Sequence, residues 1–456
     1  MNMNRCTMNT VNVVNIFIIG FSLFATCWAN NNLQTKYKWN LIDFKYEKAE
    51  ERQAAIENRT FIPANVIPVG LDVYTEKNKL FLSLPRLKNG VPASLAYIDL
   101  QELSDNDSPA LKPYPSWQSH QTVNPTDVPD IVSPFHIKVD RCHRLWAVDT
   151  GIEGLLNGNN SKRLAPSRIL IFDLRTDDII RKYALPVDLN KSVFSNIAID
   201  DDDCEDTFAY VADAGTPPSL TVYSYKTNDA WQVKHNYFNI EPTAGEFSVL
   251  GVKFRTSDAL YGLALTEKKD NGYPNLYFHA LTSYNEFNVS TAILRNKTAT
   301  EVPDFYSQFN VVGLRNADEQ AGSTVYGKSQ KVLFYTLPNK NEIACWKTSK
   351  NYTISKVYNS PVDMVYPIAI NIDNKQRIWV LSNNMQQFLN GQLDAHNTNF
   401  YVHSVPISEA IKNTPCESDL IEKIVNKFNR GGSDTSKPIA FLTFIASAML
   451  AIKQLF

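Results

Sequence analysis

Apolar residues along this chain come in paired short runs that alternate with polar positions and are separated by a polar turn. In the clearest pair, Ile137 and Val139 alternate with polar neighbours and Asp140 opens a turn. Residues 145–148 then form a second apolar run that ends at the Asp-Thr-Gly of 149–151. A period of two bounded by turn residues predicts a tight β-hairpin with one well-buried strand.

The same unit occurs six times, at intervals of roughly 45–75 residues, a spacing typical of four-stranded propeller blades with inserted loops. We therefore predict an all-β fold, a six-bladed β-propeller over residues 30–420. The alternative is a set of six unrelated hairpins in a β-sandwich. The six pairs of runs are 70–74 with 80–84, 135–139 with 145–148, 196–200 with 208–213, 251–254 with 260–265, 322–326 with 332–337, and 368–373 with 377–381.

The sixth unit is one strand short, because only residues 400–405 follow it before the chain becomes polar. Near the other end, residues 39–46 form an alternating strand that belongs to no unit. Pairing this N-terminal strand with the last blade would complete the blade and remove the exposed edges of the ring. We expect the propeller to be closed in this way.

The composition fits a strand-rich core and argues against several classes of function. Hydrophobic residues make up 44% of the 456 residues and aromatic residues 11%, which favours strands. A formal net charge of −2, without a basic block, gives no support for nucleic-acid binding. The chain has no GxSxG, HExxH, P-loop or GxGxxG motif, and its seven histidines show no ligand spacing. We expect no metal, no cofactor and no nucleic-acid partner.

The N-terminus predicts export. Arg5 precedes an apolar run at residues 11–25, and small residues follow at Cys27 and Ala29. This order predicts a secretory signal peptide at residues 1–29. A retained anchor helix is the alternative, but the run is shorter than the ~20 residues that a membrane span needs.

The C-terminus, residues 421–456, is a polar spacer followed by an apolar tail. After the Gly-Gly-Ser of 431–433, residues 438–456 are almost wholly apolar, an order that resembles a GPI-anchor signal. Lys453 interrupts the tail and the spacer is short, so a retained short membrane helix and an unstructured tail stay open. We expect a secreted, extracellular protein, with GPI anchoring at the cell surface as the hypothesis for membrane attachment.

Removal of the signal peptide takes two of the six cysteines and leaves Cys142, Cys204, Cys345 and Cys416. Four cysteines in a secreted chain predict two disulfides, with three connectivities. Cys142 and Cys204 fall in equivalent turns of adjacent predicted blades, which project from the same face, so we expect them to pair. Cys345 would then pair with Cys416 and pin the C-terminal segment to the ring. A zinc site is the competing use, but no CxxC or nearby CxH spacing exists.

Asn-X-Ser/Thr sequons agree with the extracellular compartment, where such asparagines accept N-linked glycans. A seventh sequon, at Asn106, is followed closely by Pro109 and is left out of the prediction. The six predicted glycosylation sites are Asn58, Asn159, Asn190, Asn288, Asn296 and Asn351.

Candidate ligand-binding residues lie where the innermost strands of the predicted blades begin, because propellers generally bind ligands at the mouth of the central channel. Aromatic side chains at these positions can stack on a flat aromatic ligand, and polar ones can hydrogen-bond it. For each aromatic residue the alternative is that the ring plugs the channel as core. The residues are Phe135, Phe247 and Tyr366, together with Asn196, Ser323 and Thr324.

His136 is the one titratable residue at these positions, so it is the candidate catalytic base for a proton shift such as a tautomerisation. A purely structural histidine is the alternative. Asn341, near the rim of the fifth blade, is a further candidate for ligand binding. Acidic residues also recur at strand ends, where turn capping explains them better than metal binding; they are Asp140, Asp200 and Asp373.

Several segments, in order and with all four mature cysteines, resemble the insect yellow and major royal jelly protein family. The resemblance covers about residues 39 to 416 and is closer to the yellow branch, chiefly in residues 65–68 and 84–95. The matching segments are 39–44, 61–65, 68–70, 84–86, 90–95, 146–151, 167–171, 210–213 and 345–346.

This resemblance implies a secreted six-bladed propeller linked to melanin pigmentation and cuticle. Some members of the family are dopachrome conversion enzymes, which isomerise an indoline quinone, so a tautomerase is one hypothesis. Salivary relatives bind biogenic amines without turnover, so a non-catalytic binder of amines or other small aromatic ligands is the second. A structural extracellular protein is the third. The apolar C-terminal tail is not part of the general family pattern.

Overall fold

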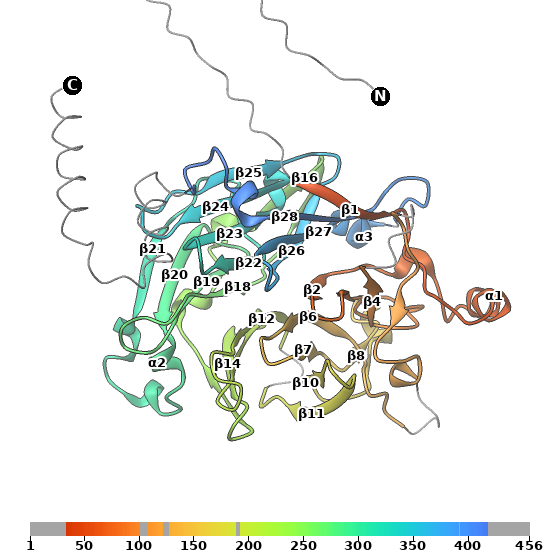
Figure 1. Cartoon of the computed structure of the whole chain (residues 1–456), viewed down its shortest axis with the longest axis horizontal. Helices are drawn as coiled ribbons and strands as arrows, with labels where there is room; N and C mark the ends of the chain where they lie inside the picture. The colour runs from red at the N-terminus through yellow and green to blue at the C-terminus, as the bar shows by residue number, and fades with distance from the viewer. Residues whose placement is uncertain (1–32, 101–106, 122–126, 188–191, 392, 418–456) are drawn as a thin grey trace, which may run out of the picture. The chain divides into compact units, whose positions relative to one another are not determined.

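Six four-stranded antiparallel sheets surround a common axis in the computed structural model, which describes residues 33–100, 107–121, 127–187, 192–391 and 393–417 (Figure 1). The predicted six-bladed propeller is confirmed. Blade one has β2 (Gly70–Tyr74), β3 (Lys79–Ser83), β4 (Leu95–Asp99) and β5 (Lys112–Pro113). Blade two has β6 (Pro134–Val139), β7 (Arg144–Asp149), β10 (Arg168–Asp173) and β11 (Asp178–Ala184). Blade three has β12 (Phe194–Asp200), β13 (Phe208–Asp213), β14 (Ser219–Ser224) and β15 (Asp229–Val233).

The other three blades follow the same order from the axis outward, and their innermost strands complete the ring of contacts around the channel. Blade four has β18 (Leu260–Leu265), β19 (Asn275–Ala280), β20 (Asn285–Ser290) and β21 (Phe309–Leu314). Blade five has β22 (Thr324–Gly327), β23 (Val332–Leu337), β24 (Glu342–Lys347) and β25 (Ser355–Asn359). Blade six has β26 (Tyr366–Ile372), β27 (Arg377–Asn383), β28 (Phe400–Pro406) and β1 (Gln34–Trp39).

Blade six is completed by the N-terminal strand, as the alternation predicted. β1 pairs antiparallel with β28, from Gln34 opposite Ser404 to Trp39 opposite Phe400. The strand nevertheless lies earlier than residues 39–46, where we expected it. Beyond Trp39 the chain leaves the sheet, and Ile42 and Phe44 pack into the cluster shared with blade one, where the backbone forms an isolated bridge between Phe44 and Leu111.

The hydrophobic core is divided among the interfaces between blades. Six clusters of buried apolar side chains occur, each drawn mainly from two neighbouring blades. Strands such as β7 and β12 are therefore buried along their whole length, because they have a blade on either side. This packing explains why the sequence shows continuous apolar runs at these strands.

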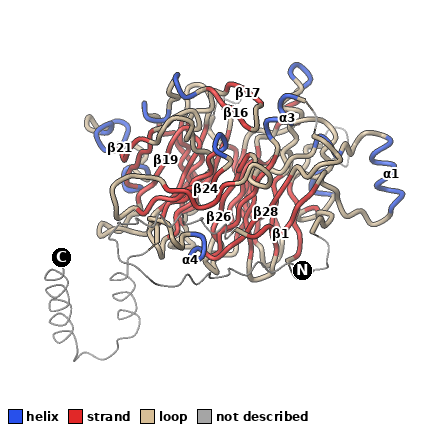
Figure 2. The backbone as a smooth tube through the Cα atoms, turned by 90° about the horizontal axis from the view of Figure 1, so that it is seen from above, coloured by secondary structure: helices blue, strands red, loops and turns tan. Residues whose placement is uncertain are grey.

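The fourth blade corrects one expectation from the sequence. We expected residues 251–254 to be its innermost strand, but β18 takes that place. Instead β16 (Glu246–Val249) and β17 (Val252–Arg255) form a separate two-stranded hairpin. Figure 2 shows this hairpin and α4 at opposite faces of the propeller. We name the face where the innermost strands begin the start face, and the face with the turns between first and second strands the turn face.

Short helices lie in the loops between strands or directly after the last strand, and the described residues form one further two-stranded sheet. The α-helices are α1 (Ala49–Glu57), α2 (Thr291–Leu294), α3 (Met385–Asn390) and α4 (Ile407–Ala410). The 3-10 helices are η1 (Pro63–Asn65), η2 (Gln118–His120), η3 (Gly158–Asn160), η4 (Asn236–Phe238), η5 (Pro242–Ala244), η6 (Ala299–Glu301), η7 (Phe305–Gln308) and η8 (Pro338–Lys340). The further sheet pairs β8 (Ile152–Glu153) with β9 (Lys162–Arg163).

Both predicted disulfides are confirmed: Cys142 pairs with Cys204, and Cys345 pairs with Cys416. The first joins the turns of blades two and three, and the second ties the end of the described chain to blade five. Within the ranges that the structure describes, no helix is long and apolar enough to cross a membrane. The predicted signal peptide and the predicted C-terminal spacer and tail lie outside these ranges.

Candidate functional site

A cavity of about 570 Å³ occupies the axis of the propeller and is lined by innermost strands of all six blades. Its walls extend from the innermost strands to the turns that follow them, and Ser323 is the one lining residue that lies just before its strand. The cavity therefore opens on the turn face, the end opposite to the one we expected. At this opening it is bordered by Glu76, Arg141, Asp201, Lys328, Asn374 and Gln376.

Aromatic side chains fill the start face of the channel. Tyr366, on β26, and Phe247, on the β16–β17 hairpin, are 6% and 2% exposed, and Tyr366 belongs to a hydrophobic cluster that Phe135 and Phe254 also contact. The ring of Phe254 lies 5.4 Å from that of Phe247 and 6.5 Å from that of Tyr366, measured between centroids. The hairpin thus packs its apolar face onto this end of the channel.

The structure divides the predicted site residues into two groups. His136, Asn196, Ser323 and Thr324 come from three blades and all line the cavity. The other predicted ligand-binding residues lie outside the cavity lining; Phe135, Phe247 and Tyr366 pack at the start face, and Asn341 lies in the turn that follows η8.

Most innermost strands carry a β-bulge shortly after they begin, and bulges change the direction in which neighbouring side chains point. The pairing with the second strand shifts between Pro134 and Ile137 in β6, Phe194 and Asn196 in β12, Leu260 and Gly262 in β18, and Pro367 and Ala369 in β26. The bulges in β6 and β18 contain His136 and Tyr261, whose rings meet edge to face at 6.1 Å. Sequence reasoning missed Tyr261 because it placed the wrong strand at the centre of blade four.

His136 is almost fully buried in the wall of the cavity. The side chain is 5% exposed and, among the described residues, no hydrogen bond to either ring nitrogen is formed. Burial opposes the charged imidazolium and lowers the pKa of His136 to about 4. At neutral pH the ring is therefore uncharged and can accept a proton or a hydrogen bond from a bound molecule.

Asn196 offers the cavity an unused hydrogen-bond donor. The residue is 8% exposed, and its Oδ1 accepts a hydrogen bond of 2.9 Å from the backbone N–H of Ile197. Its Nδ2 is buried without a partner in the part of the chain that the structure describes. A buried donor left unpaired is costly, so this amide is suited to a ligand with an acceptor oxygen.

Lys138, which sequence reasoning also missed, crosses from blade two toward blades one and six along the cavity wall. Its Nζ lies 3.5 Å from Asp72 Oδ2 and donates to Asn371 Oδ1. Asn371 Nδ2 in turn donates to the backbone carbonyl of Leu71. These contacts join the innermost strands of three blades around a single ammonium group.

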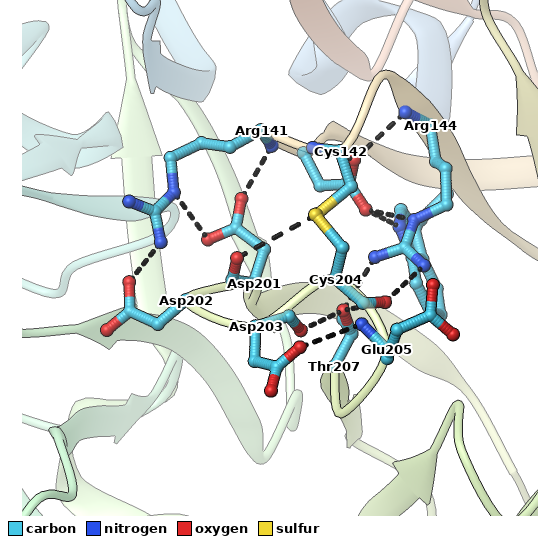
Figure 3. Close-up of a disulfide and its surroundings, with 11 residues drawn as sticks. Arg141, Cys142, Arg144, Asp201, Asp202, Asp203, Cys204, Glu205 and Thr207 are labelled. Atoms are coloured by element: carbon cyan, nitrogen blue, oxygen red, sulfur yellow. Dashed lines mark hydrogen bonds and ion pairs between the residues drawn. A yellow bond between two sulfur atoms is a disulfide. The ribbon is translucent and has the colours of Figure 1, made fainter.

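The Cys142–Cys204 disulfide lies among residues of the turns of blades two and three (Figure 3). Beside it, Arg141 pairs with Asp201 at 3.3 Å, and both residues line the cavity. On the other side, Arg144 donates to Asp140 and, at 3.1 Å, to the backbone carbonyl of Cys204. The disulfide and these ion pairs hold the turns of blades two and three in a fixed relation.

Two of the three acidic strand ends cap turns, as expected. Asp140 accepts backbone N–H bonds from Cys142 and Arg144, and Asp373 accepts them from Lys375 and Arg377. Each also accepts the indole N–H of the tryptophan six residues later, at 2.7 and 2.8 Å. The third, Asp200, instead pairs with Arg295. Within the described ranges no group of three or more His, Cys, Asp or Glu side chains could hold a metal ion.

The predicted glycosylation sites differ in accessibility. Asn58, Asn159, Asn296 and Asn351 are exposed, whereas Asn288 is half-buried in β20 and accepts a hydrogen bond from Asn310. Exposed sequon asparagines are reachable by a modifying enzyme, and a strand residue is less so. The predicted site at Asn190 lies outside the described residues.

The fold and the cavity define a β-propeller with a ligand-sized central cavity open on one face. A family model described as "Major royal jelly protein" matches residues 132–416. "Protein yellow" of Drosophila subobscura is 36% identical over 412 residues, which cover 89% of this chain and 71% of that protein. "Protein yellow" of Drosophila melanogaster is 36% identical over 410 residues, which cover 88% and 74%. The chain therefore belongs to the yellow and major royal jelly protein family.

Among solved structures, virginiamycin B lyase from Staphylococcus aureus aligns with a TM-score of 0.38 and 12% identity, over 74% of this chain and 94% of that chain. A likeness at this level does not bear on the chemistry of the cavity.

Proposed function

We propose that the protein is a secreted, yellow-type protein of melanin pigmentation and cuticle, and that its central cavity binds and tautomerises dopachrome. The observation that carries this proposal is His136, a buried and uncharged histidine that lines a cavity of about 570 Å³. That volume suits a small bicyclic ligand, since sites for small molecules measure roughly 300–1,000 Å³. Membership of the yellow and major royal jelly protein family supports the choice of substrate.

The proposed reaction is a proton shift and needs no oxidant or reductant. Two protons leave the two saturated carbons of the five-membered ring of dopachrome, one from each, and the two quinone oxygens gain one each, so the product is an aromatic dihydroxyindole. In each of the two shifts neutral His136 accepts a carbon-bound proton and returns a proton to oxygen. The unpaired Nδ2–H of Asn196 supplies a hydrogen bond to the oxygen on which negative charge develops.

The low pKa of His136 sets a condition on this chemistry. A base with a pKa of about 4 is fully available at pH 7 but is weak. A ligand that brings negative charge beside the ring favours the imidazolium and raises this pKa toward a more useful value. We therefore expect the bound complex, and not the free protein, to hold the reactive base.

Loss of dopachrome absorbance, measured against boiled protein, tests the activity. His136→Gln should lower kcat by about 10²–10⁴, the usual contribution of a general base. His143→Gln is the matched control, because His143 is a half-buried histidine that lines the same cavity near its opening. No acceleration by the wild-type protein, or equal activity of the His136 variant, would contradict the proposal.

A binder of small aromatic amines without turnover is the second candidate, and the weak basicity of His136 favours it. Calorimetry with dopamine, serotonin and octopamine tests it directly. Binding of these amines together with an inactive dopachrome assay would favour the binder. Absence of both results would favour a structural role in the extracellular matrix.

Secretion is supported by the two disulfides, which form in oxidising compartments, and by the exposed sequons. We propose in addition that the C-terminal tail directs GPI anchoring at the cell surface. Release of the protein from intact cells by phosphatidylinositol-specific phospholipase C tests the anchor, and protein found only in the medium would contradict it.

A further inference from the structure

Lys138 and Asp72 form an ion pair in the wall of the cavity, and the two side chains differ in their exposure. The side chain of Lys138 is 23% exposed, whereas that of Asp72 is 3% exposed. The Asp72 carboxylate is further occupied by the backbone N–H groups of Val73 and Val139, each at 2.8 Å. Both residues line the cavity, and the ammonium group is the more accessible of the two charges to a bound molecule.

The ammonium of Lys138 is held in place yet not saturated. It has three N–H donors, and the described residues provide two acceptors, Asp72 and Asn371. The amide of Asn371 is fixed because its Nδ2 donates to the carbonyl of Leu71, which leaves Oδ1 facing the ammonium. Asn371 is thus a positioning residue for Lys138, and the third donor is available to a ligand.

Lys138 also stands at a useful distance from the proposed base. His136 and Lys138 are two positions apart on β6 and both line the cavity, and two residues of extended strand span about 7 Å. A carboxylate one or two bonds from a carbon that contacts His136 would reach the ammonium. The same carboxylate would bring negative charge close to the imidazole, the condition under which its proton affinity rises.

We infer that Lys138 is a specificity residue, and that the cavity selects small flat ligands that carry a carboxylate over the same ring without one. This inference rests on the proposed function, since it specifies the substrate class of the same cavity. Charge-assisted bonds from a partly buried ammonium discriminate strongly between charged and neutral partners. Dopachrome carries such a carboxylate, and its decarboxylated counterpart dopaminechrome does not.

Binding of two probes tests the inference without any need for turnover. Calorimetry with indole-2-carboxylate and with indole should give tighter binding of the carboxylate by the wild-type protein. Lys138→Met should weaken indole-2-carboxylate at least 10-fold and change indole less than 2-fold. Lys328→Met, which removes the same charge at the exposed opening of the cavity, is the matched control and should change both less than 2-fold.

Lys138→Met leaves the buried Asp72 without its cation, so folding is checked by thermal unfolding. The double variant Asp72→Asn/Lys138→Met keeps the local charge balanced and should show the same loss of carboxylate binding. Lys138→Arg, which keeps the positive charge, should retain most of the affinity for indole-2-carboxylate. Equal affinity of the wild-type protein for both probes, or equal weakening of both by the double variant, would overturn the inference.

Turnover separates this inference from the proposed function. If the probes behave as expected while neither dopachrome nor dopaminechrome is converted, the carboxylate site stands and the tautomerase proposal fails. If the wild-type protein converts both quinones with equal kcat/KM and Lys138→Met slows them equally, the tautomerase stands and the carboxylate inference fails.

Discussion

Replacement of Gly262 by alanine tests how tightly blade four is packed against blade five. A Cβ built on Gly262 would lie 2.2 Å from Cε1 and from Nε2 of His279, so the imidazole occupies the space of the missing side chain. This ring is fully buried, with Nδ1 2.8 Å from Glu286 Oε2 and Nε2 2.9 Å from the carbonyl oxygen of Gly322. Gly322 belongs to the next blade, so the histidine bridges the interface.

The new methyl group forces the ring of His279 to move, and both of its hydrogen bonds are lost. Overpacking of a core costs about 1–3 kcal/mol, and a buried polar group left without its partner costs about 1–3 kcal/mol. Glu286 keeps its ion pair with Arg315 at 2.7 Å, which limits the damage. We expect Gly262→Ala to lower the free energy of unfolding by about 4 kcal/mol.

Urea unfolding with the disulfides intact measures this loss of stability, with tryptophan fluorescence as the probe of unfolding. Gly327→Ala is the matched control, since Gly327 also lies on an innermost strand but its Cβ would be 3.4 Å from Ile407 Cδ1, an ordinary contact. The control should stay within about 1 kcal/mol of the wild-type protein.

A double-mutant cycle makes the mechanism specific. If the methyl group acts by displacing the histidine, Gly262→Ala should cost little in a His279→Ala background, because the obstacle is gone. The reasoning is refuted if Gly262→Ala unfolds at the same urea concentration as the wild-type protein, or if the two substitutions are additive.

Three further predictions concern the ring and its cavity. Because burial lowers the pKa of His136 to about 4 while an unfolded histidine titrates near 6.5, the unfolded state binds more protons between these values. The free energy of unfolding should therefore fall by up to about 3 kcal/mol from pH 6.5 to 4. Urea midpoints measured across this pH range should show that this contribution is absent from His136→Gln. Trp39→Ala removes a 2% exposed side chain from the closing strand and should cost about 3–5 kcal/mol in the same assay, whereas a cost below 1 kcal/mol would show that β1 is dispensable. Paired Cys345→Ser/Cys416→Ser opens a loop of 71 residues and should lower stability by about 4 kcal/mol, with retention of full stability as the contrary result.

Much of the fold could be predicted because a blade repeats its hydrophobic pattern. The runs around Ile137 and Val148 predicted β6 and β7 in blade two, and equivalent turns predicted that Cys142 faces Cys204. Hydrophobic periodicity gave the wrong innermost strand in blade four, where two neighbouring segments both alternate like a strand. Residues 251–254 alternate like an innermost strand, and no local signal states that they pair only with the hairpin partner β16.

The candidate site was less predictable than the fold. His136 and Asn196, which we singled out because they lie near the start of an innermost strand, line one cavity. The open end of that cavity depends on which side chains fill the other end, and this packing has no sequence period. Tyr261 was missed because of the error in blade four. Lys138 was missed because it lies near the end of β6, and ligand-binding residues were expected at the start of that strand. The positions of Tyr261 and Lys138 in the site depend on long-range strand pairing and not on residue type.

Closure of the ring by β1 and β28 also fixes an order of events during biosynthesis. About 370 residues separate Trp39 from Pro406, so at 5–20 residues per second the first strand waits roughly 20–70 s for its partner. During that time one sheet edge stays open to chaperones or to other nascent chains. Cys142 and Cys204 can be oxidised early, whereas Cys345 must stay reduced until Cys416 arrives. Maturation of the propeller therefore waits for the synthesis of β28 and of Cys416.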